Sequence, residues 1–156
     1  MPTDANVRKR LEEQGFTGLG DDVLAEVAPW LRWAPVLCTF FMILGLALKS
    51  PLVLWLLACT AFMGAFLPFH PFDLLFNYGF RYLFGVRPLP HQGPQRRFAC
   101  AIATAWLFAT GWAFYVGADM VGYALGIPLV LVAALVSVTH ICIPSIIYNW
   151  FHRAGT

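Results

Sequence analysis

The chain has 156 residues, of which 60% are hydrophobic, 16% aromatic and 12% charged, and its formal net charge is +2 at pH 7. Ordinary soluble domains carry about 25% charged residues, so a soluble fold of this size has too little polar surface to cover its apolar side chains. The composition excludes a soluble globular protein and predicts an integral membrane protein.

The N-terminal segment, residues 1–28, is polar and is predicted to lie outside the membrane. It begins MPTDANVRKRLEEQ, which does not resemble a cleavable signal peptide. Residues 4–14 are highly charged and helix-prone, and Asp21 and Asp22 are candidate helix caps. We expect a solvated, charged helical segment on the cytoplasmic face, with docking of a partner as the less common alternative.

Four apolar segments are predicted to cross the membrane, because about 20 mostly apolar residues span the hydrocarbon layer. They cover residues of about 30–48, 51–67, 98–116 and 123–148. Short turns join the first segment to the second and the third to the fourth, and Pro51 suits the first turn of a helix. The sequence therefore predicts an all-α fold in which residues 29–151 form a four-helix transmembrane domain of two hairpins.

The basic residues predict the orientation of these spans. With four spans, all of the ten lysines and arginines except Lys49 lie on one side of the membrane. Cytoplasmic loops carry an excess of lysine and arginine. We therefore expect a multi-pass protein of the bacterial inner membrane, with both termini and the middle segment in the cytoplasm.

The middle segment, FLPFHPFDLLFNYGFRYLF at residues 66–84, is apolar but contains charged groups. A fifth span here would place charged side chains in hydrocarbon, where each one is unfavourable by about 2.5 to 3.5 kcal/mol. It would also move three arginines to the other side. The favoured prediction is an interfacial helix over residues 70–85, started by Pro71 and ended by Gly85.

A polar stripe of three side chains spaced four apart follows this helix: Asp73, Asn77 and Arg81. Side chains at this spacing share one helix face. Narrow polar stripes on apolar helices usually face water, which is the favoured interpretation, although the stripe also suits contact with a neighbouring segment.

The third span carries small residues four apart, namely Ala101, Ala105, Ala109, Ala113 and Gly117. Small residues at this spacing let a second helix approach closely. We expect the partner to be another span of the same four-helix unit, and a span of another subunit is the alternative.

The fourth span contains His140 in the run SVTHICIPSIIYNW. Pro144 has no N–H to donate to the His140 carbonyl, so a kink is predicted there, with Ser137 and Thr139 close enough to help. An interhelical hydrogen bond is the favoured role of His140, and a polar pocket formed with Ser137, Cys142 and His70 is the alternative.

Thiol chemistry and cofactors are further alternatives. Cys38, Cys100, His140 and Cys142 are predicted at similar depth, and His70 enters at the same boundary. His140 and Cys142 are two apart and point to different sides, so no metal site is predicted. The cofactor stays open, with a haem or chlorin ligand through His140 or His70 as one possibility.

Other function classes lack their sequence signals. The chain shows no glycine-rich phosphate loop, nucleophile elbow or intramembrane carboxylate, so no enzyme is predicted. Topology and anionic lipid explain the basic residues, so nucleic acid is not an expected partner.

Three motifs resemble a known family: FHPFD at 69–73, PQRRFA at 94–99 and CIPSIIY at 142–148. Over about residues 30–150 the chain is similar to a domain-of-unknown-function family of small bacterial four-helix membrane proteins. The resemblance implies that fold and an association with thioredoxin-like or rhodanese-like sulfur proteins. The chain has no paired-cysteine motif of its own.

The first functional hypothesis is a non-enzymatic accessory or scaffold subunit of a larger respiratory or photosynthetic membrane complex, with the lipid bilayer and other membrane subunits as partners. A membrane partner in thiol or sulfur transfer is the second hypothesis. A small-solute channel with a continuous polar pocket at His140 and Ser137 is the third.

Overall fold

The computed structural model describes residues 3–155, which are helical and contain no strand. In chain order the helices are α1 (Ala5–Glu13), α2 (Asp21–Val27), the 3-10 turn η1 (Trp30–Arg32), α3 (Trp33–Ala47), α4 (Pro51–Phe66), α5 (Pro71–Leu75), the π-helical turn η2 (Phe76–Phe80), α6 (Arg81–Phe84), α7 (Pro94–Tyr115), α8 (Asp119–Thr139) and α9 (Ile143–Ala154).

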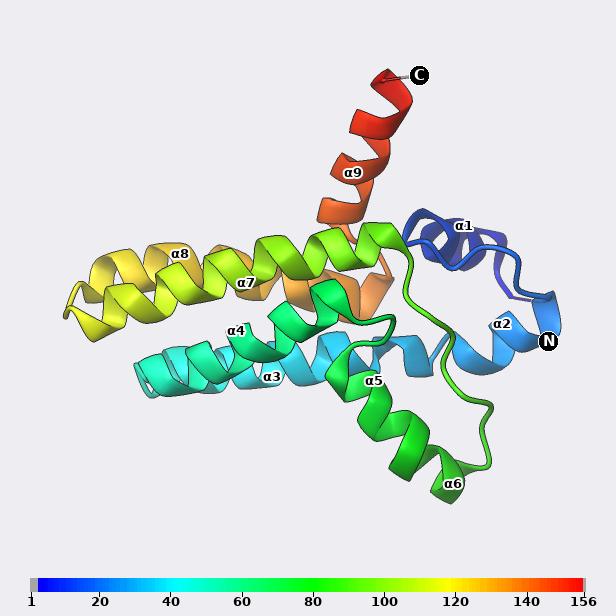
Figure 1. Ribbon diagram of the computed structural model, residues 1–156, viewed down its shortest axis with the longest axis horizontal. Coiled ribbons are helices and arrows are strands. Elements are labelled where there is room, and N and C mark those ends of the chain that lie inside the picture. The colour runs from blue at the N-terminus through cyan, green and yellow to red at the C-terminus, as the bar shows by residue number, and fades with distance from the viewer. Residues whose placement is uncertain (1–2, 156) are drawn as a thin grey trace.

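Four helices, α3, α4, α7 and α8, form a bundle (Figure 1). The α3–α4 and α7–α8 turns lie at one end, which we call the hairpin end. Helices α1, α2 and α9 lie at the other, which we call the terminal end. Helix α4 packs mainly against α7, and α3 packs against α8. Of the ten lysines and arginines, only Lys49 lies at the hairpin end, where it pairs with Asp119.

Three segments are long and apolar enough to cross a membrane: Trp30–Ala47, α7 and α8. Helix α4 meets the same test only together with the segment Pro71–Phe84, from which it is bent by 85°. Its 16 residues measure about 24 Å, less than the roughly 30 Å of a hydrocarbon core. The prediction of an all-α fold is confirmed, and the described residues contain three candidate membrane spans, or four if the bent pair counts as one.

Close contact between α4 and α7 depends on a glycine. A Cβ atom added at Gly111 would lie 2.5 Å from Nε1 of the Trp55 indole, so no larger residue fits without displacing that ring. Around this contact the core is filled by leucines and one phenylalanine, including Leu54, Leu57 and Phe114. The two helices therefore approach closely at a position outside the predicted alanine series.

The predicted fourth span over residues 123–148 is not one continuous helix, because α8 ends before His140. Helix α8 begins at Asp119 and ends at Thr139, His140 has a left-handed backbone with φ 58°, and α9 is a separate helix that points away from the bundle (Figure 1). Pro144 removes one N–H donor at this point, as expected. Side chains of the N-terminal segment replace it: Arg10 donates to the Thr139 carbonyl at 2.8 Å, and Gln14 donates to the His140 carbonyl at 2.6 Å.

The backbone carbonyls at the end of α4 also accept hydrogen bonds from side chains of distant residues. Arg97 donates from Nε to the Ala65 carbonyl at 2.9 Å and from Nη2 to the Phe66 carbonyl at 3.0 Å. The Gln92 amide donates to the carbonyls of Gly64 and Leu67. These are the last carbonyls of the helix, which have no partner within it. Side chains from the start of α7 thus allow α4 to end and the chain to turn sharply.

The predicted interfacial helix over residues 70–85 consists of three pieces, α5, η2 and α6, and it ends at Gly85 in the left-handed conformation, as expected. Its apolar face meets the N-terminal segment, where Leu11, Leu24 and Phe76 are fully buried in one cluster. The charged N-terminal segment therefore packs onto the rest of the protein. Helix α7 also starts earlier than predicted, at Pro94.

Candidate functional site: a cavity lined by three cysteines

The polar stripe on the middle segment faces the protein instead of water. Asp73 and Asn77 are buried, and Arg81 is half-buried. The Asn77 side chain accepts from the Leu89 N–H at 2.7 Å and donates to the Leu89 carbonyl at 3.4 Å. The favoured sequence interpretation is wrong for Asp73 and Asn77, because the loop after Gly85 folds back onto Asn77 and Arg96 of α7 pairs with Asp73.

Asp73 forms an ion pair with Arg96 of α7, with 3.7 Å between Oδ2 and Nη2. Both side chains are buried, at 3% and 8% exposure. A buried charge is strongly unfavourable unless it is paired. Asp73 therefore keeps a guanidinium inside the protein, where Arg96 also lies over the Phe16 ring at 5.4 Å.

A cavity of about 430 Å³ lies among α3, α4, α7 and α8. Three cysteines from separate parts of the chain line it: Cys38 of α3, Cys100 of α7 and Cys142, which precedes α9. All four cysteines of the chain are free thiols. The other polar lining residues are His70, Arg96 and Gln14. The structure thus brings together the cysteines and one histidine that the sequence placed at similar depth.

The position of His70 fixes its tautomer. It is the N-cap of α5, and its Nδ1 accepts from the Phe72 N–H at 3.3 Å. In a neutral imidazole the proton must then be on Nε2. Nε2 lies 4.0 Å from the sulfur of Cys38, so this N–H is directed at a thiol.

Gly64 of α4 makes room for this arrangement. A Cβ atom there would lie 2.7 Å from Cδ2 of His70 and 3.2 Å from the sulfur of Cys100. The histidine and the second thiol therefore sit side by side against the α4 backbone. A larger residue at this position would force one of them out of the cavity.

His140 and Ser137 do not join this cavity. Nε2 of His140 accepts from Nε of Arg32 at 2.7 Å, and the pair lines a separate pocket of about 360 Å³. The Ser137 hydroxyl donates to the Ala133 carbonyl at 2.8 Å and lies 3.3 Å from the Thr39 hydroxyl. Of the four residues in the predicted polar pocket, the structure brings only His70 and Cys142 together.

The predicted alanine series on α7 does not pack inside the bundle as expected. Ala101, Ala105, Ala109 and Gly117 are exposed, and only Ala113 is buried. The inner face carries Leu107, Thr110, Gly111 and Phe114 instead. The spacing of four selects a helix face but does not say which face meets the neighbour.

Arg96 and Gln14 are the site residues that sequence reasoning missed. Arg96 was counted only as a topological charge, and its partner Asp73 is 23 positions away. Gln14 stands in a segment that looks solvated. Within residues 3–155, no three histidine, cysteine or acidic side chains are placed to hold a metal ion.

Comparison with known proteins agrees with the family resemblance. Residues 28–153 match the model of a family described as a domain of unknown function, DUF4395. The chain belongs to this family, and the matched range includes the four bundle helices and α9 but not most of the N-terminal segment. No curated protein and no solved structure shows significant similarity to the chain.

The two buried histidines predict a pH-dependent stability. Burial, then Arg32, Arg96 and Arg10, lowers the pKa of His140 from 6.5 to about 4. Burial and then Arg96 lowers the pKa of His70 to about 3. The unfolded chain therefore binds more protons below pH 6.5, and stability should fall as the pH is lowered from about 7 to about 5.

Thermal unfolding of the purified protein in detergent at these two pH values would measure the effect. The His140→Asn variant should lose less stability on acidification, because asparagine tolerates the left-handed backbone and still accepts from Arg32. His91→Asn, at an exposed loop histidine, is the control and should behave like the wild type. An unchanged pH dependence in His140→Asn would contradict the assignment.

Proposed function

We propose that the protein carries sulfane sulfur on a membrane-embedded site formed by cysteine thiols. The observation that supports this best is the convergence of Cys38, Cys100 and Cys142 on one cavity, although they are far apart in the sequence. Cys59, the fourth cysteine, is exposed on the outer side of α4 and does not line the cavity. Close packing alone does not explain why three cysteines line a cavity that their side chains leave open.

The chemistry needs no oxidant. A thiolate of the cavity attacks the outer sulfur of a persulfide R–S–SH, the S–S bond to R breaks, and R–SH leaves with the proton released by the cysteine. One S–S bond breaks and one forms, so the product is a cysteine persulfide and no net oxidation occurs. The thiolate is the nucleophile in such exchanges. Arg96, which is paired with Asp73, is the charged residue of the cavity lining and favours the thiolate form, and the Nε2–H of His70 points at Cys38.

The donor or acceptor fits a soluble sulfur-carrying protein of the thioredoxin-like or rhodanese-like kind. The cavity lining reaches Gln14, Pro144 and Ile147 at the terminal end, next to α1 and α9. A protein that docks on this end comes close to the thiols without entering the membrane. The small-solute channel finds less support, since Ser137 is outside the lining and the cavity walls are mainly apolar.

Modification by sodium polysulfide tests the site. In the purified chain, mass spectrometry of peptides should find an added sulfur atom on Cys38, Cys100 or Cys142. The Cys38→Ser/Cys100→Ser/Cys142→Ser variant should lose the modification, and the Cys59→Ser control should keep it. Sulfur found on Cys59 alone, or on all four cysteines equally, would refute a specific cavity site.

We infer in addition that α3, α4, α7 and α8 cross a bacterial inner membrane as two hairpins, with the terminal end in the cytoplasm. The support is the charge distribution, because nine of the ten basic residues lie at the terminal end. Helix α4 is short for a span. At its terminal end, its last backbone carbonyls accept hydrogen bonds from the side chains of Arg97 and Gln92.

Fusion of reporters after Thr156 tests this orientation. A fluorescent protein that matures only in the cytoplasm should be active there, and alkaline phosphatase, which needs the periplasm, should be inactive. The same reporters inserted after Gly117, in the α7–α8 turn, should give the opposite pattern. Periplasmic activity at Thr156 would overturn the proposed topology.

An accessory role in a larger membrane complex is the second candidate. Helix α9 projects from the bundle (Figure 1) and exposes Trp150 and Phe151, at 65% and 60%. Large exposed apolar faces rimmed by polar groups often mark interfaces.

Purification from native membranes in mild detergent tests this role. A membrane partner should co-purify in fixed ratio with the wild type and be lost from the Trp150→Ala/Phe151→Ala variant. Met120→Ala, at an 84% exposed residue of the hairpin end, is the control and should keep the partner. A homogeneous lone protomer from native membranes would argue against the role.

A further inference from the structure

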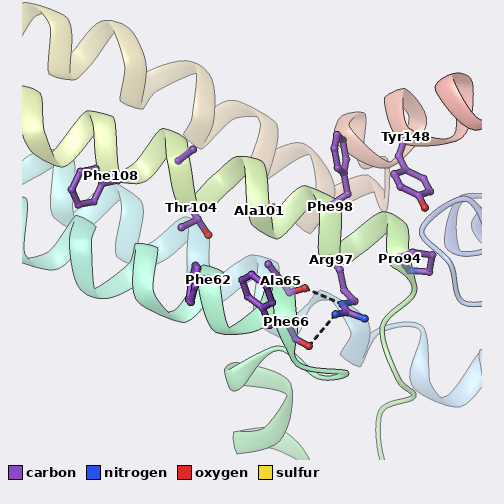
Figure 2. Close-up of a pocket in the computed structure, with 11 residues that line it drawn as sticks. Phe62, Ala65, Phe66, Pro94, Arg97, Phe98, Ala101, Thr104, Phe108 and Tyr148 are labelled. Atoms are coloured by element: carbon purple, nitrogen blue, oxygen red, sulfur yellow. Dashed lines mark hydrogen bonds between the residues drawn. The ribbon is translucent and has the colours of Figure 1, made fainter.

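A second hollow lies on the outside of the bundle, between α4 and α7, and it is separate from the thiol cavity. This groove has a volume of about 800 Å³. Figure 2 shows that its walls are aromatic and its floor is made by the small residues of α7. The lining residues that matter here are Phe62, Phe66, Phe98, Phe108, Ala101 and Ala105. Two exposed members of the alanine series, Ala101 and Ala105, therefore form the bottom of a groove that faces the surroundings of the bundle.

The groove has one charged group, Arg97, at the terminal end (Figure 2). Its Nε and Nη2 atoms donate to the carbonyls of Ala65 and Phe66, so the guanidinium is held at the end of α4. Nη1 makes no hydrogen bond within the described residues. Tyr148 of α9 lies at the same end and has a hydroxyl donor. No carboxylate lines the groove, so its polar end is complementary to an anion.

The length of the groove matches one leaflet of a bilayer. From Pro94 to Phe108 is a rise of about 21 Å along α7 at 1.5 Å per residue. Half of a hydrocarbon core is about 15 Å, and the polar headgroup region lies beyond it. A molecule whose charged group lies beside Arg97 can therefore extend its apolar part along the groove over the thickness of one leaflet.

We propose that the groove between α4 and α7 binds an anionic phospholipid. One acyl chain lies on Ala101 and Ala105 between the phenylalanines, and the phosphate accepts hydrogen bonds from Arg97 and Tyr148. Basic groups beside transmembrane helices bind anionic headgroups in this way. The lipid also explains why Ala101 and Ala105 are exposed on α7, because larger side chains at these positions would fill the groove.

Native mass spectrometry of the full chain, exchanged into detergent with added phosphatidylglycerol or phosphatidylcholine of the same acyl chains, tests the proposal. Phosphatidylglycerol should be retained preferentially. Arg97→Gln should weaken its binding about fivefold, the effect of one basic group near an anionic headgroup. Ala101→Leu and Ala105→Leu should weaken the binding of both lipids by about tenfold or more, since the groove is then overfilled.

Ala109→Leu is the matched control, because Ala109 belongs to the same exposed series but does not line the groove. It should bind lipid as the wild type does. Equal retention of the two lipids would overturn the headgroup assignment. Unchanged binding in Ala105→Leu, or equal loss in Ala109→Leu, would overturn the site. A protein dimer that Ala105→Leu dissociates would show that a second copy, and not a lipid, fills the groove.

Discussion

Backbone carbonyls at two interrupted helices are the constraint on which this structure depends. Helix α4 ends at Phe66 and α8 at Thr139, in a protein whose helices are apolar enough to lie in hydrocarbon, where water is scarce. Carbonyls without partners are strongly unfavourable there. Four side chains from distant segments donate to them: Arg97 and Gln92 at α4, Arg10 and Gln14 at α8. The N-terminal segment and the start of α7 are thereby required for the ends of other helices.

The thiol cavity follows from these two interruptions. Because α4 stops at Phe66, the chain turns and places His70 beside Gly64 and Cys100. Because α8 stops at Thr139, Cys142 lies in an extended link and lines the cavity from the terminal end. Two uninterrupted straight spans would carry His70 and Cys142 away along their axes. The buried ion pair with Asp73 then holds the Arg96 guanidinium in the cavity wall.

Much of the fold was predictable, because it depends on composition and on local sequence. The apolar segments, the start of helices at Pro51 and Pro71 and the end at Gly85 all follow from short-range rules. The candidate site was predictable only in part. Cys38, Cys100, Cys142, His70 and His140 are predicted at one depth, but depth does not fix which way a side chain points, and His140 lines a separate pocket. Asp73 and Asn77 are predicted to face water, since their partners Arg96 and Leu89 lie outside their own helix and leave no signal in its spacing.

The sequence by itself determined that the chain is helical, with segments apolar enough to cross a membrane and with its basic residues near one end, because hydrophobicity and charge act residue by residue. Only the tertiary structure decided where α8 stops, which face of α7 packs inward and which thiols meet. Those outcomes depend on donors supplied from far along the chain, such as Gln14 to the His140 carbonyl across 126 positions. They depend also on shape, as where the Trp55 ring fits only against Gly111. Pairings of this kind leave no periodic signal along the chain.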